Sequence, residues 1–198
     1  MIPAFDHNGV LPPHLGNPIQ RSDMSPYPVT AKEIVTRFGS SKERRQILSG
    51  FLQLRNDLRA DGLKGFQWVN GSFVQDVETI EKRPPKDIDV VSFVIAPVGF
   101  APAIPLQAWL LPGTAKTTYK VDHYVVDLAT HGHALVDHAR YWSGLFSHTR
   151  MGVWKGMLRV ELDPADDDAD ALKELADLSK NDAAAAAPAV VAPAGGSP

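Results

Sequence analysis

Two aspartates on a short apolar segment are the residues best placed for chemistry. Asp87 and Asp89 flank Ile88, and further apolar residues follow. Alternate side chains of a β-strand point to the same face, so the two carboxylates would share one face while Ile88 enters the opposite layer. Close carboxylates repel each other unless a cation lies between them, and paired oxygen ligands suit Mg²⁺ or Mn²⁺. The spacing therefore predicts a divalent-metal site on this strand.

A turn that can bind phosphate precedes the aspartates. Gly71 and Ser72 follow the apolar segment 66–70, which we expect to be a strand. Glycine at a strand-to-helix turn lets backbone N–H groups approach a phosphate closely, and the serine hydroxyl adds a hydrogen bond. Gly71 and Ser72 are therefore expected to form the second half of the site.

A third carboxylate comes from a later segment. Residues 117–128 are rich in β-branched and aromatic side chains, which predicts a strand that carries Asp122 and Asp127. Because these two are five residues apart, they face opposite sides of an unbroken strand. Only one of them can join Asp87 and Asp89.

These motifs resemble those of the nucleotidyltransferase superfamily that includes DNA polymerase β. The resemblance rests on Gly71-Ser72-Phe73, on Asp87-Ile88-Asp89-Val90-Val91 and on an aspartate of a later strand, and it covers roughly residues 66–128. The chain looks most like the small bacterial members, the minimal nucleotidyltransferases, some of which act as antitoxins. Residues 1–6 and 154–156 are also similar to a small uncharacterised bacterial family with this core. The gap from Ser72 to Asp87 is longer than is usual in the superfamily.

The resemblance implies metal-dependent transfer of a nucleoside monophosphate from a nucleoside triphosphate to an acceptor: a protein, an RNA end or a small molecule. Asp87, Asp89 and Asp122 would be both the catalytic residues and the ligands of Mg²⁺ or Mn²⁺. Asp122 is favoured by its Val-Asp-aromatic context, and Asp127, at the strand end, remains the alternative.

The resemblance also assigns nucleotide binding to Gly71, Ser72 and Lys86. The competing hypothesis is a non-catalytic antitoxin or regulatory protein that keeps the fold and covers a partner such as a cognate toxin.

Composition restricts the other possibilities. The chain has 198 residues, 44% of them apolar, which suits one domain. It has no cysteine, which excludes disulfides and thiolate metal sites. A net charge of −3 argues against a broad basic surface, so charge does not indicate tRNA as a partner. No segment has the pattern of a signal peptide or of a membrane helix, and we expect a cytoplasmic protein without membrane contact.

The predicted fold is α/β (α+β), a small mixed β-sheet with an acidic edge and helices packed on it. Residues 1–29 form a proline-rich arm that docks through Phe5, Val10, Leu11 and Leu15. Residues 30–180 form the nucleotidyltransferase-like domain, and residues 181–198 form a disordered tail rich in alanine and proline.

Capping boxes at Thr30 and Ser40 predict two consecutive helices, the second about 18 residues long and ending near Asp61. Further helices are expected over 106–111, ended by Pro112, over 131–147 with Leu145 on the buried side, and from 163 to about 180. Residues 157–162 are expected to form a half-exposed strand.

Several charged side chains are predicted to lie at the surface. Arg44, Arg45, Arg55 and Arg59 lie off the apolar stripe of the long helix, and His131 and His133 lack further ligands for a zinc site. Arg150 and Lys155 can meet a triphosphate, but ordinary surface charge is the favoured interpretation.

Overall fold

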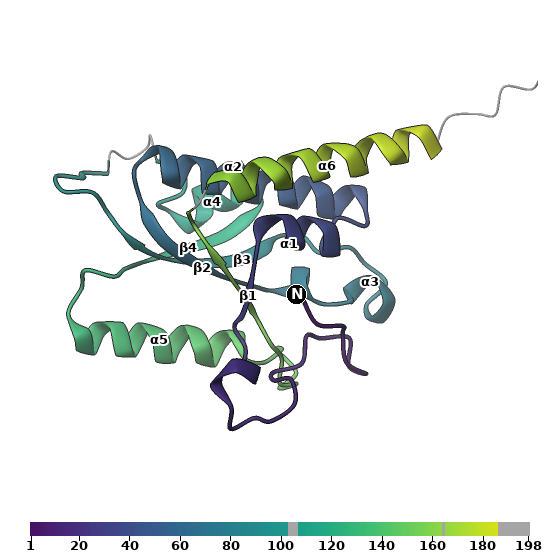
Figure 1. Ribbon diagram of the computed structural model, residues 1–198, viewed down its shortest axis with the longest axis horizontal. Coiled ribbons are helices and arrows are strands. Elements are labelled where there is room, and N and C mark those ends of the chain that lie inside the picture. The colour runs from purple at the N-terminus through teal and green to yellow at the C-terminus, as the bar shows by residue number, and fades with distance from the viewer. Residues whose placement is uncertain (103–106, 164, 186–198) are drawn as a thin grey trace, which may run out of the picture.

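A five-stranded mixed β-sheet forms the centre of the protein (Figure 1). The computed structural model describes residues 1–102, 107–163 and 165–185. The strand order is β1-β5-β2-β3-β4, with β1 parallel to β5, β3 parallel to β4, and β2 antiparallel to both of its neighbours. The strands are β1 (Tyr27–Val29), β2 (Lys64–Asn70), β3 (Ile88–Ile95), β4 (Val121–Asp127) and β5 (Leu158–Glu161). The predicted fold class, a mixed α/β sheet with helices packed on it, is confirmed.

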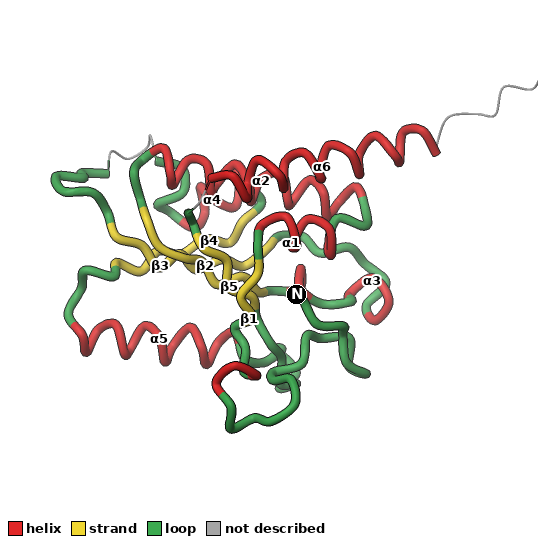
Figure 2. The backbone as a smooth tube through the Cα atoms, in the orientation of Figure 1, coloured by secondary structure: helices red, strands yellow, loops and turns green. Residues whose placement is uncertain are grey.

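The helices cover the two faces of the sheet unequally (Figure 2). One face carries α1 (Ala31–Phe38), α2 (Lys42–Ala60), α4 (Pro112–Tyr119) and α6 (Ala165–Ala185), whereas the other carries α5 (Gly132–Phe146). Short helical turns complete the fold: η1 (Arg21–Asp23), η2 (Ser72–Val74) and α3 (Val77–Ile80).

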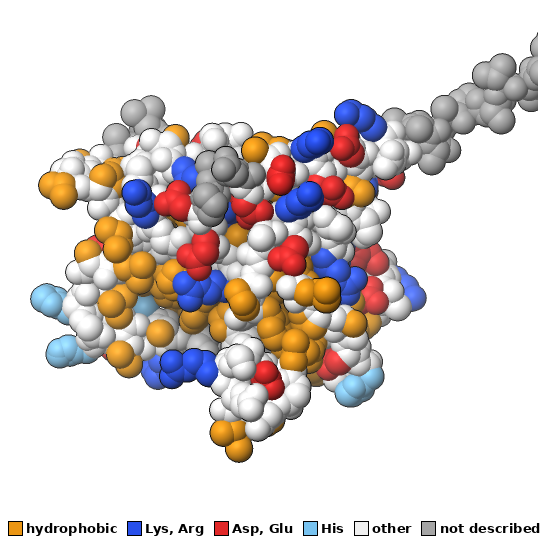
Figure 3. All heavy atoms as spheres, in the orientation of Figure 1, with side chains coloured by type: hydrophobic (Ala, Val, Ile, Leu, Met, Phe, Trp, Pro, Cys, Tyr) orange, Lys and Arg blue, Asp and Glu red, His pale blue; other side chains and the backbone are white. Residues whose placement is uncertain are grey.

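Strand alternation sorts the apolar side chains into two cores. Ile88 and Val90 of β3 pack with α1, α2, α4 and α6, whereas Val91 and Phe93 pack with Trp142 of α5. The core beside α5 is the smaller one, and hydrophobic side chains gather visibly between the upper helices and α5 (Figure 3). Leu145, which was predicted to be buried, is 47% exposed, because one helix cannot turn every apolar residue toward the sheet.

The first two helices begin close to where the capping signals predict. Thr30 and Glu33 form the complete capping box of α1. The α2 helix is capped by Ser41, one residue later than predicted, and its 19 residues end at Ala60. At each helix start, the capping side chain accepts a hydrogen bond from a backbone N–H three residues later.

The order of helix and strand around Pro112 differs from the prediction. Pro112 opens α4 rather than ending a helix, because a proline in the first helical turn has no N–H that needs a partner. The helix continues through Thr117, whose hydroxyl donates to the carbonyl of Gly113. Lys120 ends it in the left-handed region, and β4 begins at Val121. Residues 107–111 are not helical, and Leu106 lies outside the described residues.

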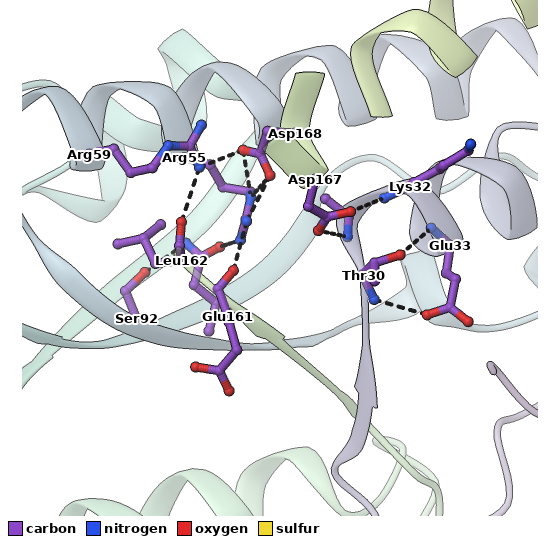
Figure 4. Close-up of polar contacts among 12 residues, drawn as sticks. Thr30, Lys32, Glu33, Arg55, Arg59, Ser92, Glu161, Leu162, Asp167 and Asp168 are labelled. Atoms are coloured by element: carbon purple, nitrogen blue, oxygen red, sulfur yellow. Dashed lines mark hydrogen bonds and ion pairs between the residues drawn. The ribbon is translucent and has the colours of Figure 1, made fainter. Parts of the chain in front are cut away.

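The prediction of a solvated arginine face on α2 is wrong for Arg44, Arg45 and Arg55, which are buried. Arg55 is fully enclosed because α6 packs over this side of α2 (Figure 4). It binds Asp168 of α6, while Arg59 contacts the same carboxylate at 2.6 Å.

The N-terminal arm is docked, as expected, and contributes the edge strand β1. Val10 and Leu11 are buried, but Leu15 is exposed, contrary to the prediction. At the other terminus, α6 extends to Ala185 instead of ending near Lys180. The predicted tail therefore overlaps the helix, and residues 186–198 lie outside the described residues.

Candidate functional site

Three carboxylates lie together at one end of the parallel pair β3 and β4. Asp87 directly precedes β3, and Asp89 is in register with Asp122 of β4. Asp127 pairs with Val94 at the opposite end of β4, where its carboxylate accepts a hydrogen bond from the N–H of Ala129. The strand pairing thus places Asp122, and not Asp127, beside Asp87 and Asp89.

A lysine already lies between two of these carboxylates. The Nζ atom of Lys116 on α4 is 2.7 Å from Oδ2 of Asp87 and 3.4 Å from Oδ2 of Asp122. The hydrogen bond to Asp87 and the charges of both aspartates raise the pKa of Lys116. As they stand, no three aspartate, glutamate or histidine side chains in the described part of the chain form a metal-binding group. The ammonium group is instead the cation shared by Asp87 and Asp122.

Asp89 is the most perturbed acid of the cluster. Burial raises its pKa to about 6, and the nearby carboxylates of Asp87 and Asp122 contribute in the same direction. Lys155 and Lys116 oppose the shift without cancelling it. An additional positive charge here would therefore stabilise the ionised form of Asp89.

The Gly71–Ser72 turn directly adjoins Asp89. Asn70, the last residue of β2, is in register with Asp89, and Gly71 follows at a φ of 87°. A Cβ atom on Gly71 would lie 2.8 Å from Cγ of Asp89, so this position excludes larger residues both by conformation and by contact. The Oδ1 atom of Asn70 accepts a 2.7 Å hydrogen bond from the N–H of Gly71 and fixes the turn. Ser72 then opens η2, as predicted for a strand-to-helix turn.

Lys155 belongs to the site, contrary to the prediction that it is ordinary surface charge. Only 4% of this residue is exposed, and its Nζ donates to the carbonyl of Gly71 at 3.3 Å. Burial lowers its pKa to about 8, although the carboxylate of Asp89 favours the charged form. No pattern in the local sequence distinguishes Lys155 from the exposed Arg150, because the Gly71 carbonyl that it contacts is 84 residues away in the chain.

Lys86, the remaining residue assigned to nucleotide binding, and the two histidines expected at the surface are all exposed. Lys86 lies next to Asp87 in the chain, and the histidines are His131 and His133.

A buried polar chain behind the cluster was not predicted. Arg55 donates to Gln67 at 2.8 Å, and Gln67 donates to the hydroxyl of Ser92 at 2.9 Å. Nε2 of His123 lies 2.8 Å from that hydroxyl, and its Nδ1 lies 2.7 Å from the carbonyl oxygen of Trp109. These hydrogen-bonded side chains link the core beneath α2 to β4, the strand that carries Asp122.

Comparison with known proteins gives one match. The model of a family of unknown function (DUF6932) matches residues 3–161, which include the arm, the whole sheet and every member of the acidic cluster. No curated protein and no solved structure matches the chain. No helix of the described residues is both long and apolar enough to cross a membrane.

Proposed function

We propose that this chain, which belongs to the DUF6932 family, is a cytoplasmic, metal-dependent nucleotidyltransferase. One observation carries the proposal: Asp87, Asp89 and Asp122 lie at one edge of the sheet, directly beside the Gly71–Ser72 turn. A cluster of acids at such a turn, in which Asp89 has a raised pKa, is typical of a functional site rather than of a solvated surface.

The donor set fits a hard divalent cation. Asp87, Asp89 and Asp122 supply carboxylate oxygens, which Mg²⁺ and Mn²⁺ prefer. Burial and the neighbouring carboxylates raise the pKa of Asp89, and a bound cation would oppose that shift. When bound there, Mg²⁺ or Mn²⁺ would supply charge stabilisation for the phosphates of a nucleoside triphosphate.

The protein's own groups would orient the nucleotide. The Gly71–Ser72 turn offers close backbone approach, and the buried ammonium of Lys155 provides a fixed positive charge behind it. Lys86, exposed beside Asp87, adds a second cation at the rim. A carboxylate of the acidic edge would act as a general base and accept the proton of the acceptor hydroxyl. That hydroxyl would belong to a protein, an RNA end or a small molecule.

One observation favours a second candidate, a non-catalytic antitoxin or regulatory protein that covers a partner such as a toxin. Lys116 pairs with Asp87 and Asp122, so part of the acidic charge is balanced without a metal ion. In that case the fold would be retained while the acids serve stability or partner binding. The two candidates differ in whether a divalent cation binds.

Thermal unfolding tests this difference. We expect Mn²⁺ or Mg²⁺ with a nucleoside triphosphate to raise the melting temperature of the wild type, because ligands that bind the folded state stabilise it. The double substitution Asp87→Ala and Asp89→Ala should abolish the rise, whereas Asp127→Ala, at the far end of β4, should keep it. An equal rise in the double variant would remove the acidic edge as the metal site.

A further inference from the structure

A hollow of about 600 Å³ lies beside β4, between the start of α4 and α5. Aromatic side chains form much of its wall: Tyr124 of β4 and Tyr141 and Trp142 of α5. Tyr124 and Tyr141 both contact Trp142. The ring centroid of Tyr124 lies 4.8 Å from that of Trp142, and the ring centroid of Tyr141 lies 5.0 Å from it. Tyr141 is nevertheless 55% exposed, so a large part of this ring is open to a ligand.

The backbone of β4 adds hydrogen-bonding groups to the same hollow. Within the described sheet β4 is an edge strand that pairs with β3. The carbonyl of Lys120 and the N–H of Leu128 bond to the β3 side, and successive residues of a paired strand alternate in direction. The backbone groups of His123 and Val125 therefore turn away from β3, and both residues line the hollow.

The hollow adjoins the acidic edge. Asp122 and Tyr124 are two residues apart on β4, so their side chains share one face of the strand. Pro112, at the rim of the hollow, opens the helix that carries Lys116.

We propose that this hollow binds the nucleobase of the nucleotide whose phosphates lie at the acidic edge, an inference that rests on the function proposed above. Aromatic faces stack on any base, and a strand edge offers the alternating donors and acceptors that the edge of a base requires. Asp122 and Tyr124 are about 6.6 Å apart along β4, and the sugar would span this separation between the two ends of the ligand.

Calorimetric titration of the full-length protein in Mg²⁺ with ATP, UTP and inorganic tripolyphosphate tests this assignment. In the wild type we expect at least one of the two nucleotides to bind more tightly than tripolyphosphate. The substitution Tyr141→Ala should weaken that nucleotide about tenfold and leave tripolyphosphate unchanged, because only the stacking surface is lost. Leu145→Ala, which truncates another exposed apolar residue of α5 outside the hollow, is the matched control and should change neither affinity.

Two results would overturn the assignment: equal affinities of the wild type for tripolyphosphate and both nucleotides, or an unchanged nucleotide affinity in Tyr141→Ala at an unaltered melting temperature. Failure of the acidic site gives a different pattern. If Asp87→Asn with Asp122→Asn leaves tripolyphosphate binding intact while Tyr141→Ala still weakens the nucleotide, the base site stands and the phosphate site is wrong.

Discussion

The two lysines at the acidic edge, Lys116 and Lys155, differ in how far their side chains are exposed to solvent. The Lys116 side chain is 51% exposed and reaches Asp87 and Asp122 from α4, so solvent can replace its contacts. Lys155 is buried against Gly71 and has no comparable access to water. If a divalent cation binds as proposed, it would displace Lys116 at small cost, because exposed ion pairs contribute little to stability, whereas Lys155 would stay beside the phosphates.

His123 is held neutral by its surroundings. Its Nδ1 must donate to the carbonyl of Trp109, so Nε2 accepts from the hydroxyl of Ser92. Burial lowers the pKa of His123 to about 4, below the ordinary value of 6.5. As the pH falls below 6.5, the unfolded chain binds a proton that the folded protein cannot accept until about pH 4. Protonation therefore favours unfolding throughout this interval.

We expect the wild type to lose roughly 3 kcal/mol of unfolding free energy through this residue between pH 6.5 and pH 4. The variant His123→Gln should be less stable at pH 7 but should lack this part of the pH dependence. Urea unfolding across the interval measures the difference, with the exposed His131→Gln as control. Parallel stability curves for the wild type and His123→Gln would show that His123 does not titrate as described.

At the scale of elements, α6 is fastened to the domain by two adjacent carboxylates (Figure 4). Asp168 binds Arg55 and Arg59 of α2. Asp167 accepts a 2.5 Å hydrogen bond from the N–H of Ala31, in the first turn of α1. The acidic start of α6 therefore caps one helix and neutralises buried arginines of another. Because Arg55 is fully buried, its positive charge would lack a counter-charge without Asp168.

The substitution Asp168→Asn should lower the unfolding free energy by about 3–5 kcal/mol, because it leaves a buried guanidinium without a counter-charge. Asp170→Asn removes the same charge from an exposed position of α6 and should change stability by less than about 0.5 kcal/mol. Chemical denaturation of both variants compares them directly. Equal, small losses would mean that the Arg55–Asp168 pair does not hold α6 in place.

Local signals predicted the elements better than they predicted burial. The capping residues Thr30 and Ser41 depend on near neighbours, and both helix starts were predicted within one residue. The strand expected over 117–128 begins only at Val121, because α4 continues to Tyr119. The burial of Arg55 depends on Asp168, 113 residues later in the chain, so the pattern within α2 could not reveal it. The boundary at Pro112 was missed because proline suits both the end and the first turn of a helix.

At the scale of the whole molecule, the N-terminal arm packs against Gly156, next to Lys155 of the site. The N–H of Gly156 donates to the carbonyl of Leu11 at 2.7 Å, and a Cβ on Gly156 would lie 2.4 Å from the carbonyl oxygen of Pro12. This contact places the arm against Gly156, the residue that follows Lys155. The family model spans both the arm and this segment, consistent with their acting as one unit.

The candidate site also combines features that are local in the sequence with positions that depend on tertiary packing. The spacing of Asp87 and Asp89 and the glycine before Ser72 are local features, so the sequence alone could indicate them. The positions of Lys116, Lys155 and Tyr141 depend on how α4, the segment before β5 and α5 pack around the sheet. Pairing of β3 with β4 also decides which late aspartate joins the cluster, because alternation alone leaves Asp122 and Asp127 open.

Transfer of label from α-labelled nucleoside triphosphates tests the central claim most directly. The protein is incubated with Mg²⁺ or Mn²⁺, each labelled nucleotide, and either the product of the adjacent gene or bulk tRNA. We expect the wild type and Asp127→Asn to label an acceptor. Asp122→Asn should lose turnover by orders of magnitude, because a metal ligand is lost. It should remain folded, because the substitution also relieves repulsion among the acids. Absence of labelling by the wild type with its natural partner present, or loss of labelling in Asp127→Asn alone, would contradict the account.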